Sequence, residues 1–173
     1  MILPTRQEKE KLNGHQGLAI WLTGLPASGK STLALHVVQE LLNRNYTASV
    51  LDSDVLQLGL CSDLDYSPGS RSENIRRAGE VAKLLVNTGS IVVTAFISPY
   101  LADRSRLRAL LGKDCFYEVF LSCLLDICEK RDPKGLYRKA GSGLITSFTR
   151  ITAPYEVPKF PDLVIPAGQL DSK

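Results

Sequence analysis

The residues with the clearest chemistry form the run Gly24-Leu25-Pro26-Ala27-Ser28-Gly29-Lys30-Ser31. Backbone N–H groups of such a glycine-rich loop, and of the helix that follows it, converge on phosphate oxygens. Lys30 is spaced to reach the β- and γ-phosphates, and the Ser31 hydroxyl is spaced to ligate Mg²⁺. The pattern predicts nucleoside-triphosphate binding. The alternative is a glycine turn that only joins a strand to a helix.

Two carboxylates are the next candidates. Asp52 and Asp54 follow an expected strand at 47–51, and the carboxyl ends of parallel strands form the ligand side of such a sheet. One carboxylate could act on Mg²⁺ through a water molecule, the metal role expected of Asp52, while the other accepts a proton. The alternative for either residue is that it caps the short helix after the strand.

Strands and helices alternate along the chain, which indicates an α/β fold. Expected strands lie at 18–23, 47–51, 91–96, 116–121 and 162–165, and expected helices at 30–42, 70–87, 101–111 and 124–131. The helix at 70 would open with a capping box, Ser70-Arg71-Ser72-Glu73. The pattern predicts a P-loop-type three-layer sandwich, in which helices cover both faces of a mostly parallel five-stranded sheet.

The chain of 173 residues has the size of one domain, expected at 18–173 after a flexible arm at 1–17. Residues 132–156, rich in Gly, Pro, Ser, Thr and basic side chains, are expected to form a mobile lid. The net charge of +3 calls for neither a nucleic-acid nor a membrane partner. The N-terminus has no apolar signal-peptide core, so a cytoplasmic location is expected. The four cysteines form no Cys-x-x-Cys pair and are expected to be free thiols.

Several further motifs resemble one family, the adenylylsulfate (APS) kinases. They are Trp21 to Thr32, which contains the glycine-rich loop, Arg71-Ser72-Glu73-Asn74-Ile75-Arg76-Arg77, Phe96-Ile97-Ser98-Pro99-Tyr100, Arg131-Asp132-Pro133-Lys134-Gly135-Leu136-Tyr137 and Pro154-Tyr155-Glu156. They follow the family order from about residue 17 to 166. The resemblance implies a homodimeric kinase that uses ATP and Mg²⁺ to phosphorylate the 3′-hydroxyl of adenosine 5′-phosphosulfate (APS), giving PAPS for sulfate assimilation.

The resemblance also implies roles for individual residues. Asp54, Lys30 and Ser98 would be catalytic, Asp54 beside the 3′-hydroxyl, although the role of Ser98 is open. The ATP site would comprise Gly24, Leu25, Pro26, Ala27, Ser28, Gly29, Lys30, Ser31, Thr32 and Arg131, and the APS site Asp54, Gln57, Tyr66, Arg71, Asn74, Ile97, Ser98, Lys134 and Phe148. Tyr66 and Phe148 would clamp the adenine by stacking. The alternatives are that Tyr66 is a packing residue and that Phe148 pins the lid to the core.

The chain departs from the family pattern in the acceptor half. Ser53 replaces a glycine between the two aspartates, and Gln57 replaces an arginine that contacts the substrate. Losing a charge-assisted contact to an anion costs about 1.5–3 kcal/mol. The lid differs at Gly141, Leu144, Thr146 and Arg150. Three interpretations stay open: an APS kinase with altered affinity, a related kinase with another small-molecule acceptor, or a nucleotide-binding protein with little turnover.

Overall fold

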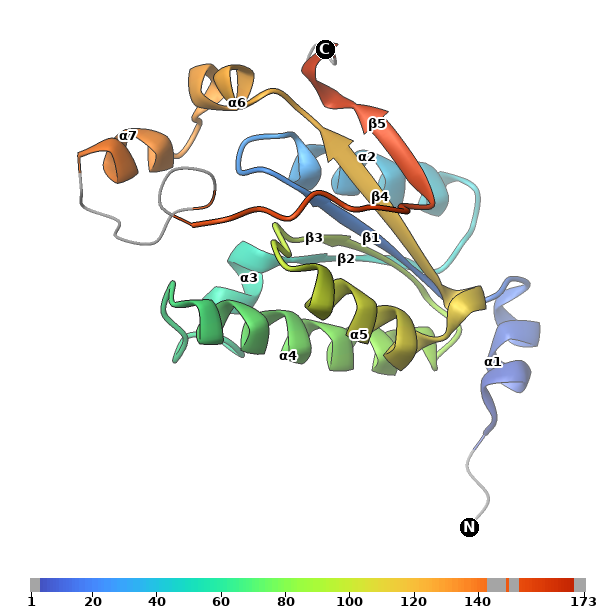
Figure 1. Ribbon diagram of the computed structural model, residues 1–173. Coiled ribbons are helices and arrows are strands. Elements are labelled where there is room, and N and C mark those ends of the chain that lie inside the picture. Colours follow the sequence, from blue (N-terminus) through green and yellow to red (C-terminus); the bar gives the residue numbers. More distant parts are fainter. Residues whose placement is uncertain (1–3, 143–148, 150–152, 170–173) are drawn as a thin grey trace.

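The computed structural model describes residues 4–142, 149 and 153–169. Its centre is a sheet of five parallel strands, as predicted, in the order β2-β3-β1-β4-β5 (Figure 1). The strands are β1 (Leu18–Gly24), β2 (Ala48–Asp52), β3 (Ile91–Ala95), β4 (Phe116–Ser122) and β5 (Leu163–Pro166). Strand β1 is the central strand and pairs with β3 and β4, so the loop that follows β1 lies in the middle of the carboxyl edge.

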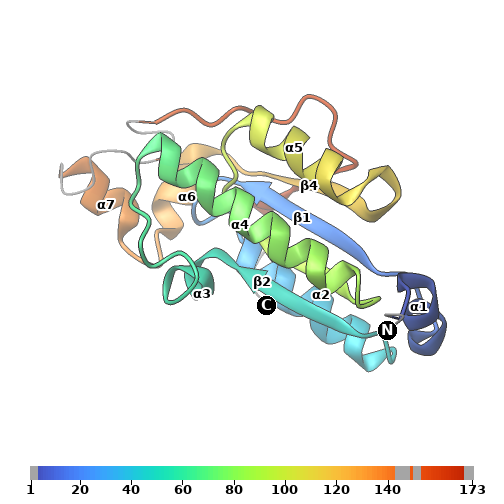
Figure 2. The same ribbon diagram turned by 90° about the horizontal axis from the view of Figure 1, so that it is seen from below.

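Helices cover both faces of the sheet, which confirms the predicted three layers. The helices are α1 (Arg6–Asn13), α2 (Lys30–Asn43), α3 (Ser53–Gln57), α4 (Pro68–Val86), α5 (Leu101–Leu111), α6 (Leu125–Arg131) and α7 (Leu136–Gly141), with 3₁₀ turns η1 (Lys113–Cys115) and η2 (Ala167–Gln169). Helix α2 packs on one face, while α4 and α5 lie side by side on the other (Figures 1 and 2). In the described ranges, no helix is both long and apolar enough to cross a membrane.

Successive side chains of a strand point to opposite faces of the sheet and therefore pack in two different cores. Trp21 faces α4 and α5, where its ring stacks on that of Phe96 with 5.2 Å between centroids. The next residue, Leu22, packs toward α2. All five residues of β3 are buried, which explains its unbroken apolar sequence. Truncating a buried aromatic such as Trp21 to alanine costs about 3–5 kcal/mol.

The N-terminal segment, expected to be a flexible arm, contains helix α1 instead. Thr5 and Glu8 form a capping box at its start, and Gly14 ends it with a φ of 72°. Arg6 Nη2 donates to the Gly17 carbonyl at 2.6 Å, and Asn13 Nδ2 donates to the Gly89 carbonyl at 3.0 Å. The helix buries none of its residues, so it carries no apolar periodicity by which sequence could reveal it.

Helix α4 begins earlier than the sequence predicts. Its N-cap is Ser67, whose hydroxyl accepts from the Ser70 amide at 3.3 Å, and Pro68 occupies the first turn. Proline favours this position because its missing N–H is not needed there and its φ suits a helix. The predicted capping box at Ser70 was therefore wrong, and Arg71 and Asn74 lie in the first turns of α4 rather than at its cap.

Candidate functional site

The glycine-rich loop turns the chain from β1 into α2 through three residues of positive φ. Gly24 has a φ of 155°, Ala27 of 60° and Gly29 of 97°. A Cβ on Gly24 would lie 2.8 Å from the Leu121 carbonyl oxygen, so the loop could not lie this close to β4 with another residue there. The turn brings the N-terminus of α2, with its partial positive charge, to the carboxyl edge of the sheet.

Lys30 lies over this loop with its ammonium group buried. Its Nζ donates to the carbonyls of Gly24 at 3.0 Å and Leu25 at 2.6 Å, and lies 3.4 Å from Ser28 Oγ. Burial lowers the pKa of Lys30 to about 8, because a charge is costly in a site with little water. A bound triphosphate would supply the missing opposite charge.

A cleft of about 700 Å³ opens beside the loop. We call it the donor cleft. The residues that the sequence assigned to ATP and that line it are Pro26, Ala27, Ser28, Gly29, Lys30, Ser31, Thr32 and Arg131. Gly24 and Leu25 lie behind this lining and provide the carbonyls that hold Lys30. Arg131 Nη2 donates to the Ala167 carbonyl at 3.1 Å, across the cleft from the loop.

Ser31 and Asp52 also line the donor cleft, and these are the residues predicted to hold Mg²⁺. Asp52 Oδ1 accepts from the Asp54 amide at 2.9 Å and caps α3, which was the alternative left open by the sequence. Its other carboxylate oxygen remains available to a hydrated cation. Among the described residues no group of three or more His, Cys, Asp or Glu side chains could hold a metal. This donor set fits Mg²⁺, which keeps several waters and takes one or two protein oxygens plus phosphates.

A second cavity of about 200 Å³ lies between α3, α4 and the loop after β3. We call it the acceptor cavity. It collects every described residue that the sequence assigned to APS: Asp54, Gln57, Tyr66, Arg71, Asn74, Ile97, Ser98 and Lys134. Phe148 lies outside the described residues, as do Leu144, Thr146 and Arg150.

The two cavities meet at a common wall. Asp54, Ile97 and Lys134 line both of them. The Lys134 ammonium forms an ion pair with the Asp54 carboxylate, which joins the turn before α7 to the start of α3. A carboxylate on this wall can reach a group in the acceptor cavity and a phosphoryl group in the donor cleft.

Arg71 and Tyr66 give the acceptor cavity its charged and aromatic sides. Arg71 Nε donates to the Tyr66 carbonyl at 3.0 Å, and Nη1 donates to Thr149 Oγ1 at 2.5 Å. Burial lowers the pKa of Arg71, although a guanidinium stays protonated at neutral pH. The Tyr66 side chain is 55% exposed, so it is not part of the core.

The first part of the expected lid is attached to the phosphate loop. The Asp132 carboxylate accepts from the amides of Tyr137 and Arg138, both at 3.1 Å, and so orders the start of α7. The Tyr137 hydroxyl donates to the Pro26 carbonyl at 3.1 Å. Sequence did not predict α7, because a helix of six residues offers too few positions for a periodic pattern.

Ser98 occupies a different environment from the one that a catalytic hydroxyl needs. Its side chain is 1% exposed, accepts from Trp21 Nε1 at 3.1 Å and donates to Thr23 Oγ1 at 3.0 Å. Thr23 in turn contacts the Tyr155 hydroxyl at 3.0 Å. Ser98 has a φ of 39°, which is strained for a residue other than glycine. The geometry favours a supporting role for its hydroxyl.

Sequence reasoning missed Thr23 and Tyr155, whose partners are distant in the chain, and it did not separate Arg104 from its neighbours. Arg104, Arg106 and Arg108 alternate in the sequence. Residues two apart point to nearly opposite sides of a helix. Accordingly the Arg104 side chain is 2% exposed while that of Arg106 is 76% exposed. The helical reading of 101–111 was the signal that could have shown this.

Comparisons with known proteins agree with this geometry. Residues 16–166 match the family model for adenylylsulphate kinase. An adenylyl-sulfate kinase of Bacillus velezensis is 51% identical over 96% of this chain and 85% of its own length. One from Geotalea daltonii is 55% identical over 93% of this chain and 79% of its own.

A solved structure of the Mycobacterium tuberculosis APS kinase CysC in complex with AMPPNP and APS is similar with a TM-score of 0.83 and 46% identity. The match covers 87% of this chain and 88% of that one. A gluconokinase from Sinorhizobium meliloti, at 15% identity and a TM-score of 0.59, shares the fold alone. The family match over most of the chain, together with relatives at about half identity, establishes that this protein belongs to the adenylylsulphate kinase family.

Proposed function

We propose that the protein transfers the γ-phosphoryl group of ATP to the 3′-hydroxyl of APS, giving ADP and PAPS. The observation that carries this proposal is the wall shared by the donor cleft and the acceptor cavity, which contains Asp54. Phosphoryl transfer needs the attacking oxygen and the γ-phosphate in line, and catalysis is mostly positioning and electrostatics. Two cavities that meet at a carboxylate provide this arrangement.

In this proposal, the role of each residue follows from its position. Asp54 accepts the proton of the 3′-hydroxyl as that oxygen attacks phosphorus. Lys30 and Arg131 stabilise the negative charge that spreads over the transferred group. Ser31, and Asp52 through water, would hold Mg²⁺, which would offset the negative charge of the triphosphate. Lys134, on the shared wall, keeps the turn before α7 against Asp54.

The acceptor cavity suits a purine nucleotide with an anionic tail. Tyr66 offers an exposed ring for stacking on a base, and the Arg71 guanidinium places a positive charge at this cavity that suits a phosphosulfate. Asn74 adds a buried amide to the lining of the acceptor cavity. These three residues support APS as the acceptor.

Gln57 is the observation that favours a second candidate, a kinase for a different small molecule. It lines the acceptor cavity, where the family pattern has a charged residue. A neutral amide offers hydrogen bonds but no charge, so it binds an anion less tightly. An acceptor with less negative charge would lose less binding affinity when a glutamine stands in place of the charged residue.

The deciding experiment supplies Mg·ATP with APS and follows ADP and PAPS by ion-pair chromatography. PAPS formed in step with ADP supports the proposal, and the signal should disappear when EDTA removes Mg²⁺. ADP formed only with another acceptor favours the second candidate. Binding of ATP without transfer to any acceptor would indicate a nucleotide-binding role with little turnover.

Two finer proposals accompany this function. The family resemblance implies a homodimer, which light scattering on a size-exclusion column distinguishes from a monomer of 19.0 kDa. The second is a cytoplasmic location, which fits the use of ATP. Fractionation of cells that express the full gene tests it.

A further inference from the structure

Arg104 is a buried arginine on α5 that holds two separate segments of chain. Its Nη1 donates to the Ser98 carbonyl at 2.5 Å, and its Nη2 donates to the Glu156 carbonyl at 2.5 Å. The guanidinium carbon lies 5.8 Å from the centroid of the Tyr155 ring. Arg104 is not among the described residues that line either cavity. Its contacts therefore act on the site through other residues.

The first of these segments forms part of the acceptor cavity. Ile97, Ser98 and Pro99 line it, immediately after β3. The positive φ of Ser98 is a conformation that persists only where surrounding contacts enforce it. Arg104 holds the carbonyl of this strained residue, while Trp21 and Thr23 hold its hydroxyl.

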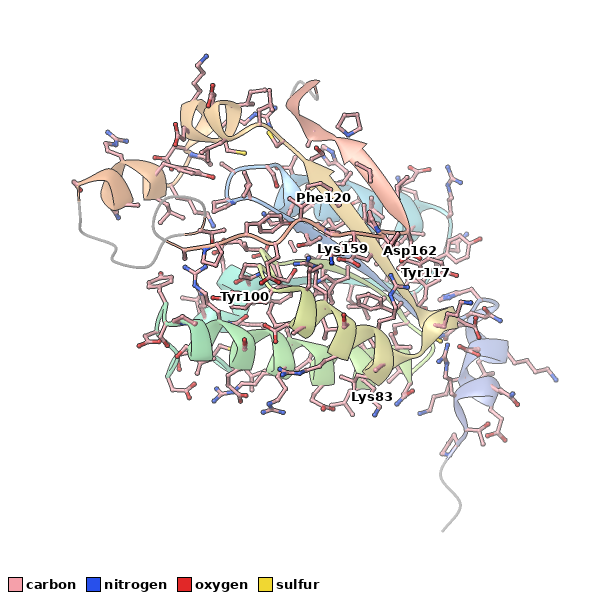
Figure 3. All side chains as sticks on the ribbon, in the orientation of Figure 1. Lys83, Tyr100, Tyr117, Phe120, Lys159 and Asp162 are labelled. Atoms are coloured by element: carbon pink, nitrogen blue, oxygen red, sulfur yellow. The ribbon has the colours of Figure 1, made fainter. Side chains whose placement is uncertain are left out.

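The second segment lies where the chain returns from the lid. The Glu156 amide donates to the Pro99 carbonyl at 2.8 Å, and Glu156 Oε2 accepts from the Leu101 amide at 2.6 Å. Further along, the chain runs back to β4, where Asp162, labelled in Figure 3, accepts from the Glu118 amide at 2.7 Å. The segment thus joins the end of the lid to the loop that lines the acceptor cavity.

The ion pair between Arg104 and Glu118 does not stabilise the fold enough to explain why this buried position carries a charge. Arg104 Nε lies 2.7 Å from Glu118 Oε1, yet neither atom has a well-aligned hydrogen bond. Burial raises the pKa of Glu118, which shows that the carboxylate also loses solvation there. Replacing such a buried pair with apolar side chains is often neutral or stabilising. What an apolar side chain cannot do is hold two carbonyls at once, which a guanidinium does with its rigid fork.

We propose that Arg104 is a positioning residue for the acceptor site. It fixes the strained loop at Ser98 against the segment that ends the lid, and so maintains the wall against which the acceptor binds. The inference rests on the proposed function, in which this cavity holds APS. Because the phosphate loop has its own supports, loss of Arg104 should affect APS far more than ATP.

The test compares Arg104→Lys and Arg104→Met with a matched control, Leu107→Ala. Leu107 lies one turn further along α5, is equally buried and packs in the core away from both cavities. A displaced wall raises the KM for APS roughly tenfold to a hundredfold in Arg104→Met, since misplacement by about 1 Å can cost a hundredfold. Arg104→Lys, which keeps the charge but not the fork, should fall between. The KM for ATP should change less than about threefold.

Leu107→Ala should lower the melting temperature while leaving both KM values within about threefold. The proposal is overturned if Arg104→Met leaves the KM for APS unchanged, if both KM values rise together, or if Leu107→Ala reproduces the effect. Should Arg104→Met fail to fold because Glu118 loses its buried partner, the double variant Arg104→Met/Glu118→Gln removes that charge and takes its place in the comparison.

Direct titration with APS separates this proposal from the proposed function. Wild type that binds APS without making PAPS contradicts the function, and the APS affinities of the Arg104 variants then decide the positioning role alone. Arg104 variants that bind APS as tightly as the wild type refute the positioning role. Wild type that does not bind APS at all refutes both.

Discussion

Binding of ATP should take up protons in alkaline solution, because Lys30 is buried beside the phosphate loop. In the free protein burial holds the pKa of Lys30 at about 8, below its ordinary value. At 1.36 kcal/mol per pKa unit, keeping Lys30 charged costs the free protein about 3 kcal/mol. A triphosphate beside the ammonium favours the charged form and raises the pKa of Lys30 again.

The direction and size of the proton uptake follow from the protonation of Lys30 in the free and in the ATP-bound protein. Free Lys30 is mostly protonated at pH 7, half protonated at pH 8 and mostly neutral at pH 9, while bound Lys30 stays protonated throughout. Uptake per ATP bound should therefore rise from about 0.1 proton at pH 7 to about 0.5 at pH 8 and about 0.9 at pH 9. Affinity falls in parallel by about tenfold between pH 7 and pH 9.

Isothermal titration calorimetry with a non-hydrolysable ATP analogue and Mg²⁺, in two buffers of different ionisation enthalpy, measures this uptake. Lys30→Arg is the matched control, because arginine keeps the positive charge and does not titrate in this range. The rise in uptake should be absent in that variant. Uptake that is the same at pH 7 and pH 9, or an equal rise in Lys30→Arg, would refute the assignment of a depressed pKa to Lys30.

Three further substitutions test the other parts of the site. Asp54→Asn should lower kcat by about 10²–10⁴-fold with the affinity for an ATP analogue nearly unchanged; a variant with wild-type kcat in the ADP-release assay would remove Asp54 as the base. Gln57→Arg should tighten APS binding by about tenfold in a titration, and an unchanged affinity would place the anion elsewhere in the cavity. Ser98→Ala should lower the unfolding free energy by about 1–3 kcal/mol in urea titrations, because it leaves the buried Trp21 N–H without its acceptor. It should keep kcat within about tenfold, and a loss beyond a thousandfold would make the hydroxyl catalytic.

Local pattern was enough to predict the elements that bury one face. The spacing of Leu33, Val37 and Leu41 predicted α2, which spans Lys30–Asn43. The apolar run after residue 90 predicted β3 as a buried inner strand. The order of the strands was less accessible to sequence, because it depends on crossovers that no local pattern encodes.

The helices that sequence missed are short, with eight residues in α1 and six in α7. Helix α1 is held by polar contacts from Arg6 and Asn13, and α7 by the Asp132 carboxylate and the Tyr137 hydroxyl. Side-chain hydrogen bonds hold both helices, and α7 also buries Tyr137 and Ala140. A hydrophobic pattern predicts segments that pack by an apolar face, and it does not predict segments that polar contacts hold in place.

The residues of the candidate site also fall into a group that sequence predicted and a group that it missed. Residues expected to meet ligand lie in short local motifs, so motif spacing found Lys30, Asp54 and Arg71, each of which lines a cavity. Residues that hold those motifs in place can bond across long separations, as Thr23 does with Tyr155 and Arg104 with Glu156. Sequence marked Ser98 for its hydroxyl, whereas the structure holds that buried hydroxyl between Trp21 and Thr23. The chemistry at the wall thus depends on buried groups that no ligand need touch, and substitutions there can change acceptor affinity while every contact residue is retained.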